Sequence, residues 1–366
     1  MARYRVEGGF PSVLINMSRI EHPRQLVGHR ARVAPRKARR PWGGVVGAAW
    51  GWLVITVALS VIVRTAGDRW WVVTAALLFG PRWVFVIPLG ILAVVSLVCC
   101  RRALWIVLAT GVLFAIGFLN YNLPWGRLMG ATEGKAVRLL TCNVHRHELS
   151  PSEFGLLLSD TSPDVVLMQE WSSRNDPAFG GRSQWNIRRD GEYCIATRYP
   201  IVSFAVVRFA GIDPEEMAVR YILQIEGRQV CVYNVHLTSP HRAFEDVMAG
   251  GAGAGEMVDR NSDERRFQSW SLRDGAVKST APVVLAGDFN TPPESSVYRT
   301  YWSGFDNAFT SCGVGLGHTY NTRRASMRID HVLTGRGWAC NRCWVGRDVG
   351  SAHRPLIAEL VLTAKR

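Results

Sequence analysis

The first third of the chain alternates long apolar runs with short polar breaks. One run of 20 uncharged residues covers positions 44–63, and two shorter runs follow at 83–100 and 103–119. At 1.5 Å per residue, about 20 apolar residues cross a hydrocarbon core roughly 30 Å thick. Three such runs within about 80 residues predict a transmembrane region over residues 43–120 with three helices, in preference to buried helices of a soluble domain.

A further apolar segment, residues 70–80, is too short to cross a membrane. It begins with Trp70 and Trp71 and ends at Gly80-Pro81, a pair that interrupts helices. Tryptophan favours the boundary between membrane and water, so we expect an interfacial or re-entrant piece here. If this segment also crossed, the domain that follows would lie on the other side of the membrane.

Positive charge is concentrated before and between the apolar runs. Residues 1–42 hold ten Lys/Arg and two Asp/Glu, residues 43–129 hold six and one, and residues 130–366 hold 27 and 26. Cytoplasmic segments are rich in Lys and Arg, so residues 1–42 are predicted to be a cytoplasmic tail. Three spans then place the later domain outside the cytoplasm. That domain is nearly neutral, so the pI of 9.9 does not itself indicate nucleic-acid binding.

Beyond a linker at 121–136, the pattern changes to short apolar runs bounded by turn residues. Ser150 and Glu153 form a capping box that predicts a helix through residue 158, and a second helix is expected at 263–279. Buried strands are expected at 136–144, 164–169, 193–197, 230–235 and 282–287. Strands mixed with helices over this length predict an α/β or α+β domain.

Polar side chains gather where these strands end, or in later turns. They are Asn143, Glu170, Asn234, His236, Asp288, Asn290, Asp330 and His353. Residues two apart share one face of a strand, so Asn234 with His236, and Asp288 with Asn290, are predicted to project into one cleft. Carboxylates, amides and histidines suit an oxygen-preferring divalent cation and a phosphate group. Ordinary capped strand ends are the alternative.

The motifs in this part of the chain resemble the endonuclease/exonuclease/phosphatase superfamily. In order they are Thr141-Cys-Asn143, Gln169-Glu170, Ala196-Thr-Arg-Tyr-Pro200, Asn234-Val-His-Leu237, Gly287-Asp-Phe-Asn290, Arg328-Ile-Asp-His331 and Ser351-Ala-His-Arg-Pro355. The resemblance implies an α/β four-layer sandwich over residues 137–366, with two packed β-sheets flanked by helices and an α-helical transmembrane region before it. The preceding spans resemble those of a bacterial, membrane-anchored subgroup.

The resemblance also implies a metal site. Glu170 would hold the cation, with Asn143 nearby, and Mg²⁺ is expected, with Mn²⁺ as the alternative. Mg²⁺ keeps several waters, so one or two carboxylates are enough. The family usually has Ser-Asp-His where this chain has Ala352 in the middle position. Weakened metal binding is expected, unless an acid such as Asp348 substitutes.

Three residues are implied to act on the phosphate. Asp288 and Asn290 would position the attacking water and the phosphate group. His236 would donate to a phosphate oxygen as negative charge builds up on it. The alternatives are a turn-capping Asp288 and a packed His236.

Two further residues form the implied acid–base pair. Asp330 would accept from one imidazole nitrogen of His353, which fixes the tautomer and raises the basicity of the other nitrogen. A buried structural pair is the alternative. His331 is adjacent to Asp330 and points to the opposite face of a strand, so we interpret it as structural.

The sequence thus predicts a divalent-metal-dependent phosphoesterase in a bacterial inner membrane, with an extracytoplasmic catalytic domain. Its expected partners are the bilayer and a phosphodiester or phosphomonoester, and no protein partner is predicted. Nucleic acid, phospholipid headgroups and small phosphoesters all stay open as substrates, with proximity to lipid favouring the last two. A catalytically degenerate phosphate-binding or scaffold protein is the alternative that Ala352 suggests. A sensor or transporter accessory would need charges within the spans, and none is present there.

Overall fold

A computed structural model of the chain describes residues 42–124, 126, 130–145, 149–179, 184–208, 216–248, 253–323 and 325–363. The basic tail predicted for residues 1–42 lies outside them, except for Trp42. Residues 41–366 form one compact unit.

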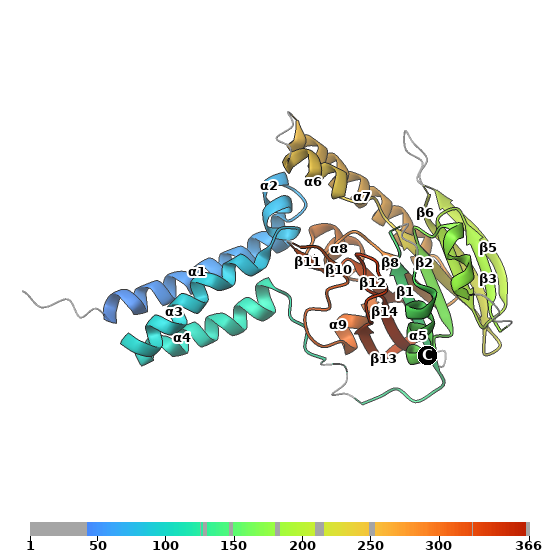
Figure 1. Cartoon of the computed structure of the whole chain (residues 1–366), viewed down its shortest axis with the longest axis horizontal. Coiled ribbons are helices and arrows are strands. Elements are labelled where there is room, and N and C mark those ends of the chain that lie inside the picture. The colour runs from blue at the N-terminus through green and yellow to red at the C-terminus, as the bar shows by residue number, and fades with distance from the viewer. Residues whose placement is uncertain are drawn as a thin grey trace, which may run out of the picture. The chain divides into compact units, whose positions relative to one another are not determined.

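Three helical segments are long and apolar enough to cross a membrane. They are Trp42–Ala66, Arg82–Cys99 and Arg101–Phe118, with 25, 18 and 18 residues. The first is α1, the second joins a 3₁₀ turn η2 (Arg82–Phe85) to α3 (Val86–Cys99), and the third joins α4 (Arg101–Leu113) to a π-helical turn η3 (Phe114–Phe118). They lie side by side (Figure 1). Small residues such as Ala49 and Ala103 are buried between them, while Val98 and Trp105 leave large apolar surfaces exposed. Such outward apolar surface is typical of a bundle that contacts lipid.

The segment between α1 and η2 does not form another span. It contains only α2 (Trp71–Val73) and a π-helical turn η1 (Thr74–Leu78). Both are far shorter than the roughly 20 residues that a crossing needs.

The first sheet has six strands in the order β13-β14-β1-β2-β4-β3. Their bounds are β1 Ala136–Asn143, β2 Val165–Gln169, β3 Asn186–Asp190, β4 Tyr193–Thr197, β13 Trp338–Val345 and β14 Leu356–Leu362. Strands β1 and β2 are parallel, with Asn143 opposite Gln169. Their carboxyl ends therefore meet at one edge of the sheet.

The second sheet also has six strands, in the order β5-β6-β7-β8-β12-β9. Their bounds are β5 Ile201–Arg208, β6 Glu216–Ile225, β7 Arg228–His236, β8 Val283–Asp288, β9 Asp306–Asn307 and β12 Asp330–Thr334. Strands β7 and β8 are parallel, and β8 and β12 are antiparallel. A two-stranded ribbon, β10 (Tyr320–Asn321) with β11 (Ser326–Met327), stands apart from both sheets.

The two sheets pack face to face, with helices on their outer faces (Figure 1). Alternate residues of both sheets form the inner core, including Leu139, Leu167, Tyr221 and Val284. The outer face of the first sheet is covered by α5 (Pro151–Thr161), with the 3₁₀ turn η5 (Ser173–Phe179). The second sheet is covered by α7 (Ala254–Val277) and α8 (Ser296–Tyr301). Helices α6 (His241–Met248) and α9 (Ala308–Cys312) complete the domain. This arrangement confirms the predicted four-layer sandwich.

Candidate active site

Strand register alone brings three of the predicted residues into one row. His236 at the end of β7 is opposite Asp288 at the end of β8. Asp288 is in turn opposite Asp330, the first residue of β12. Because residues opposite each other in a sheet have close Cβ atoms, these side chains meet at one sheet edge.

The first sheet contributes Asn143, whose amide links both sheets. Its Nδ2 lies 3.1 Å from Glu170 Oε1 and 3.0 Å from Asp288 Oδ2, and 3.5 Å from His236 Nε2. Its Oδ1 accepts from the backbone N–H of His145 at 2.8 Å. The ends of β1, β2, β7 and β8 therefore converge on a single cluster.

The turn conformations at this edge are unusual and aim the side chains inward. Glu170 and Asn290 have φ of 50° and 47°, a left-handed backbone that is uncommon outside glycine. Gly287 has φ of 144°, and a Cβ there would collide with the backbone of Val235 on β7. The glycine of Gly287-Asp-Phe-Asn290 is thus required for β8 to pair so closely with β7.

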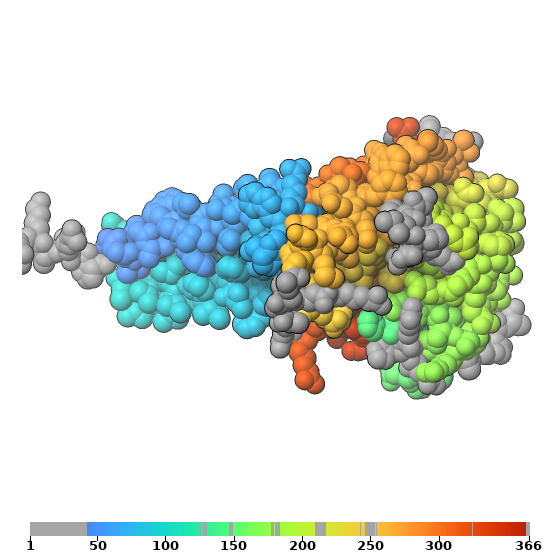
Figure 2. All heavy atoms as spheres, turned by 90° about the horizontal axis from the view of Figure 1, so that it is seen from above, coloured from blue at the N-terminus to red at the C-terminus, as the bar shows by residue number. Residues whose placement is uncertain are grey.

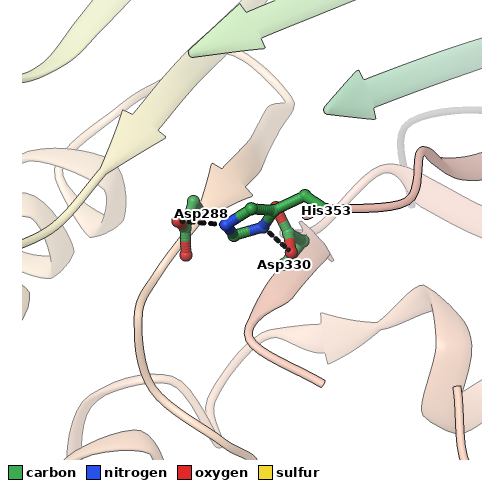
Figure 3. Close-up of side chains that lie close together, drawn as sticks. All are labelled: Asp288, Asp330 and His353. Atoms are coloured by element: carbon green, nitrogen blue, oxygen red, sulfur yellow. Dashed lines mark hydrogen bonds and ion pairs between the residues drawn. The ribbon is translucent and has the colours of Figure 1, made fainter. Parts of the chain in front are cut away.

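His353 and Asp330 form a buried pair (Figure 3). Nδ1 of the histidine lies 2.9 Å from Oδ2 of the aspartate, and Nε2 lies 3.7 Å from Oδ2 of Asp288. Burial alone would lower the pKa of His353, but the carboxylates of Asp330 and Asp288 outweigh it and raise this pKa to about 9. The imidazole therefore carries a proton on each nitrogen at neutral pH.

Asp288 sits between charges of both signs. Burial and the nearby Asp330 carboxylate raise the pKa of Asp288, and the two histidines lower it, with a result of about 6. Oδ1 of Asp288 accepts from the backbone N–H of Asn290 at 2.8 Å. A carboxylate with this pKa is ionised at neutral pH and still basic enough to accept a proton.

His236 has a partner that sequence reasoning missed, Glu192. Nδ1 of His236 lies 2.7 Å from Oε1 of Glu192, in the turn between β3 and β4. Burial would lower the pKa of His236, but the hydrogen bond to Glu192 and the charges of Asp288 and Glu170 raise it. Only the position of Glu192 directly before the β4 run could have drawn attention to it. Tyr320, whose ring lies 4.7 Å from that of His353, gave no signal in the sequence.

Two asparagines predicted to face the cleft, Asn234 and Asn290, make hydrogen bonds that hold the fold. Asn234, predicted to share the cleft with His236, is buried between the sheets, where its amide bonds to the Gln169 side chain and to the carbonyls of Met168 and Cys194. That prediction is wrong because a strand residue two positions deeper is covered by the inner core. The side chain of Asn290 donates to the Leu237 carbonyl at 2.8 Å, which holds the turn after β8 against β7.

His331 faces away from the cluster, on the outer side of the second sheet. Its Nε2 lies 2.9 Å from the Thr291 carbonyl, and its Nδ1 lies 3.2 Å from Nδ2 of Asn307. A carbonyl accepts and an amide NH₂ donates, so the pair of contacts fits the neutral ring protonated on Nε2. Burial lowers the pKa of His331 to about 4.

The donor set fits a hard divalent cation. Oxygen atoms of Glu170 and Asp288 both approach Asn143, and the carboxylates of Asp288 and Asp330 offer oxygen atoms within 4.8 Å of each other. Oδ1 of Asp330 is buried and has no hydrogen-bond partner among the described residues. Carboxylate oxygens are ligands that Mg²⁺ and Mn²⁺ prefer. Asn143 turns its amide nitrogen to these carboxylates, so its oxygen would have to leave the His145 N–H to bind a cation.

The loop directly before His353, which the structure describes in full, contributes no acidic side chain to the cleft. Ala352 supplies only its backbone, whose carbonyl accepts from the N–H of Asn321 at 3.0 Å. Asp348 is exposed, its Oδ1 accepts from the N–H of Gly350, and it is not part of the cleft lining. Ser351 is the structural member of this motif, since its hydroxyl donates to the Asn143 carbonyl and accepts from the His353 N–H.

The cluster forms the floor of a cleft of about 450 Å³. Its polar part contains Asn143, Glu170, Asp288, Asn290 and His353, and the remaining lining is largely apolar. Within the described parts of the chain, none of the residues that line it is Lys or Arg. The cleft thus joins a polar centre of carboxylates and histidine to an apolar wall.

Comparisons with known proteins point to one family. The model of the Endonuclease/Exonuclease/phosphatase family matches residues 140–353. Among solved structures, the 3′-5′ exonuclease NExo from Neisseria meningitidis is 19% identical with a TM-score of 0.48, covering 62% of this chain and all of the exonuclease. A family protein from Bacteroides thetaiotaomicron is 14% identical with a TM-score of 0.47, covering 64% and 100%. D. rerio TDP2 complexed with single-strand DNA product is 14% identical with a TM-score of 0.47, covering 62% and 99%. No curated protein sequence matches the chain.

Proposed function

Because the chain belongs to the endonuclease/exonuclease/phosphatase family, we propose that it is a divalent-metal-dependent phosphoesterase held in a membrane by its three apolar helices. The observation that carries this proposal is the convergence of Asn143, Glu170, Asp288 and His353 from separate strands and loops into one buried polar cluster. Buried carboxylates in such numbers are costly to a fold without a cation or a reaction to serve.

Glu170 and Asn143 would hold the metal ion, Mg²⁺ or Mn²⁺. When bound, this cation supplies Lewis-acid stabilisation of charge on the phosphoryl group and its leaving oxygen. The other proposed roles belong to protein groups around this site.

Asp288 and His353 would handle the protons of the reaction. Asp288, ionised at neutral pH, accepts a proton from the attacking water, and Asn290 keeps the Asp288 carboxylate in place through its N–H. His353 holds a proton on Nε2, 3.7 Å from Asp288 Oδ2, so one water or phosphate oxygen can contact both groups. Asp330 fixes the imidazole through Nδ1 and keeps it protonated.

His236 would act on the phosphate oxygens. Glu192 accepts from Nδ1 and, with the charges of Asp288 and Glu170, favours the protonated ring, whose Nε2–H would face the carboxylates of Glu170 and Asp288 at 3.7 and 4.0 Å. A charge-assisted donor at this place stabilises negative charge as it builds up on the phosphate.

The test is hydrolysis by the full chain in detergent micelles. Bis(p-nitrophenyl) phosphate and p-nitrophenyl phosphate are assayed with Mg²⁺, with Mn²⁺ and after chelation. We expect metal-dependent release of nitrophenolate that His353→Ala lowers by at least about 100-fold, the usual scale of acid–base catalysis. Asp306→Asn on β9 is the matched surface control. No turnover with either metal, or turnover that survives His353→Ala, would overturn the proposal.

Ala352 favours a second candidate, a degenerate phosphate-binding domain. In that case inorganic phosphate would bind at the cluster, with a metal or without it, and neither ester would be hydrolysed. Calorimetry with inorganic phosphate, run beside the hydrolysis assay, separates the two functions.

The membrane topology is part of the same proposal. A cytoplasmic tail and three crossings place the catalytic domain outside the cytoplasm of a bacterial inner membrane. Alkaline phosphatase fused after residue 363 is then expected to be active, and green fluorescent protein fused there to be dark. The reverse pattern would place the domain in the cytoplasm.

A further inference from the structure

One wall of the catalytic cleft comes from the membrane region. Ala75, Phe79, Gly80 and Pro81 line the cleft together with the polar cluster. These residues lie between the end of α1 and the start of η2, and thus between two segments long enough to cross a membrane. The wall therefore lies close to the level at which the chain leaves and re-enters the bilayer.

Buried polar contacts fix this wall to the hydrolase domain. Asp68 Oδ2 accepts from the Ser295 hydroxyl at 2.5 Å and from the Val297 N–H at 3.1 Å, at the start of α8. Arg82 pairs with Glu294 at 2.5 Å, and both side chains are largely buried. Since breaking a buried ion pair costs several kcal/mol, these contacts hold the segment against the hydrolase domain.

The wall continues across the hydrolase side of the cleft. The ring of Phe79 lies 5.1 Å from that of Phe244 on α6, and Met327 and Ile329 belong to the same apolar cluster. Pro240 also lines the cleft. In Figure 2 the light-blue segment that contains the wall borders the yellow-orange helices α6 and α7. A purely structural junction would be closed, whereas about 450 Å³ remains open here.

The described lining of the cleft is acidic. Nucleic-acid sites carry Lys and Arg for the phosphates on either side of the reacting one. Among the residues that the structure describes, the cleft lining includes neither, and Glu245 adds a further acid beside Glu170 and Asp288. A substrate with one phosphate group and an apolar remainder matches both parts of the cleft.

Aromatic residues mark the membrane boundary beside the wall. Trp70 and Trp83 flank the segment and are 66% and 59% exposed. Exposed tryptophans next to membrane spans are typical of the interfacial region, where lipid headgroups lie. A lipid phosphate at this depth would be level with the cleft.

We infer that the cleft takes the phosphoester headgroup of a membrane lipid, with the first carbons of its apolar chain against Phe79 and Phe244. This inference rests on the proposed phosphoesterase function and names its substrate class. The phosphate reaches the polar cluster while the chain remains on the apolar wall. The energy of chain burial is then available to hold the lipid in the site.

The experiment measures binding, so that it does not depend on turnover. The full chain in detergent micelles with Mg²⁺ is titrated by calorimetry with butyl, hexyl and octyl phosphate, and separately with a single-stranded DNA oligonucleotide. Each added methylene is expected to tighten binding by about fourfold, given roughly 0.8 kcal/mol per buried CH₂. Phe79→Ser and Phe244→Ser should each flatten this dependence. Phe204→Ser, at an exposed phenylalanine on β5, is the matched control and should not.

The outcomes separate this inference from the proposed function. Three results would each overturn the lipid assignment, even with full phosphoesterase activity. The first is a wild-type affinity that does not depend on chain length, and the second is a chain-length dependence that survives both wall variants. The third is tighter binding of the oligonucleotide than of octyl phosphate. Chain-length-dependent binding without hydrolysis of either nitrophenyl ester would instead overturn the catalytic proposal and leave a lipid-phosphate-binding site. Partitioning of the alkyl phosphates into detergent micelles is the same for the wild type and the variants, so it cancels in the ratio of their dissociation constants.

Discussion

Replacing Asp330 by Asn tests the acid–base pair most directly. The change keeps the shape of a fully buried side chain and removes one charge, 2.9 Å from Nδ1 of His353. An amide oxygen can still accept from Nδ1, so the orientation of the imidazole is retained. The variant therefore separates electrostatic support from positioning.

The size of the effect follows from the pKa of His353. Against the opposing effect of burial, two carboxylates raise this pKa from 6.5 to about 9, and Asp330 contributes more than Asp288. Removing the larger contribution should lower the pKa by at least about 1.2, or roughly 1.7 kcal/mol of imidazolium stabilisation. Since the protonated ring is the active form, we expect activity to fall by about 15-fold well above pH 9, and far less at neutral pH, where both rings stay mostly protonated.

The assay is the pH dependence of kcat/KM for bis(p-nitrophenyl) phosphate, which reports groups of the free enzyme. The protonated ring is the active form in this mechanism, so the alkaline limb should move to lower pH in Asp330→Asn. Asp306→Asn makes the same substitution at an exposed site on β9, which pairs with β12, and should leave the limb unmoved. A loss below threefold well above pH 9 with an unshifted alkaline limb would refute the reasoning.

Three further predictions concern the metal site and the fold. Glu170→Gln should weaken Mg²⁺ binding by at least about tenfold in calorimetry, and unchanged affinity would remove Glu170 from the metal site. Ala352→Asp should tighten Mg²⁺ binding and raise activity at low Mg²⁺, whereas a null effect would show that the missing carboxylate is not limiting. The pKa of His331 is lowered to about 4, so the unfolded chain binds a proton more readily than the folded one. The free energy of unfolding should therefore fall by up to roughly 3 kcal/mol as pH drops from 6.5 toward 4. His331→Gln should remove that part of the pH dependence of the melting temperature, and identical profiles would contradict the neutral-ring assignment.

Much of the fold was predictable because its strands are short, apolar and bounded by turn residues. The expected strands at 136–144 and 193–197 correspond to β1 and β4, and the capping box at Ser150 opens α5, with its hydroxyl accepting from the Glu153 N–H at 3.4 Å. The helix expected at 263–279 begins earlier, at Ala254. Its added turns pack against Trp71 on α2, a long-range contact that local pattern does not encode.

The residues of the site were predictable one by one, but their partners were not. Strand-end position and spacing indicated His236 and Asp288, and the register of β7 with β8 then brings them opposite each other. Glu192 approaches His236 from the other sheet, so no spacing along the chain relates them. The same holds for Asp68 and Arg82, which lie among apolar helices and find their partners more than 200 residues later.

Residues 67–81, which follow α1, are attached to the hydrolase domain by buried contacts. The domain therefore cannot be separated from its anchor without exposing those contacts. A fragment cut within residues 121–136, or the same domain grafted onto an unrelated membrane helix, would uncover Ile329 and Phe244 and leave Glu294 without its cation. Losing Leu78 and Phe79, both buried, would remove roughly 3–6 kcal/mol of apolar burial, a large share of the stability of a typical domain. Anchor and hydrolase are therefore expected to fold as one unit, and a soluble truncation should be prone to aggregation.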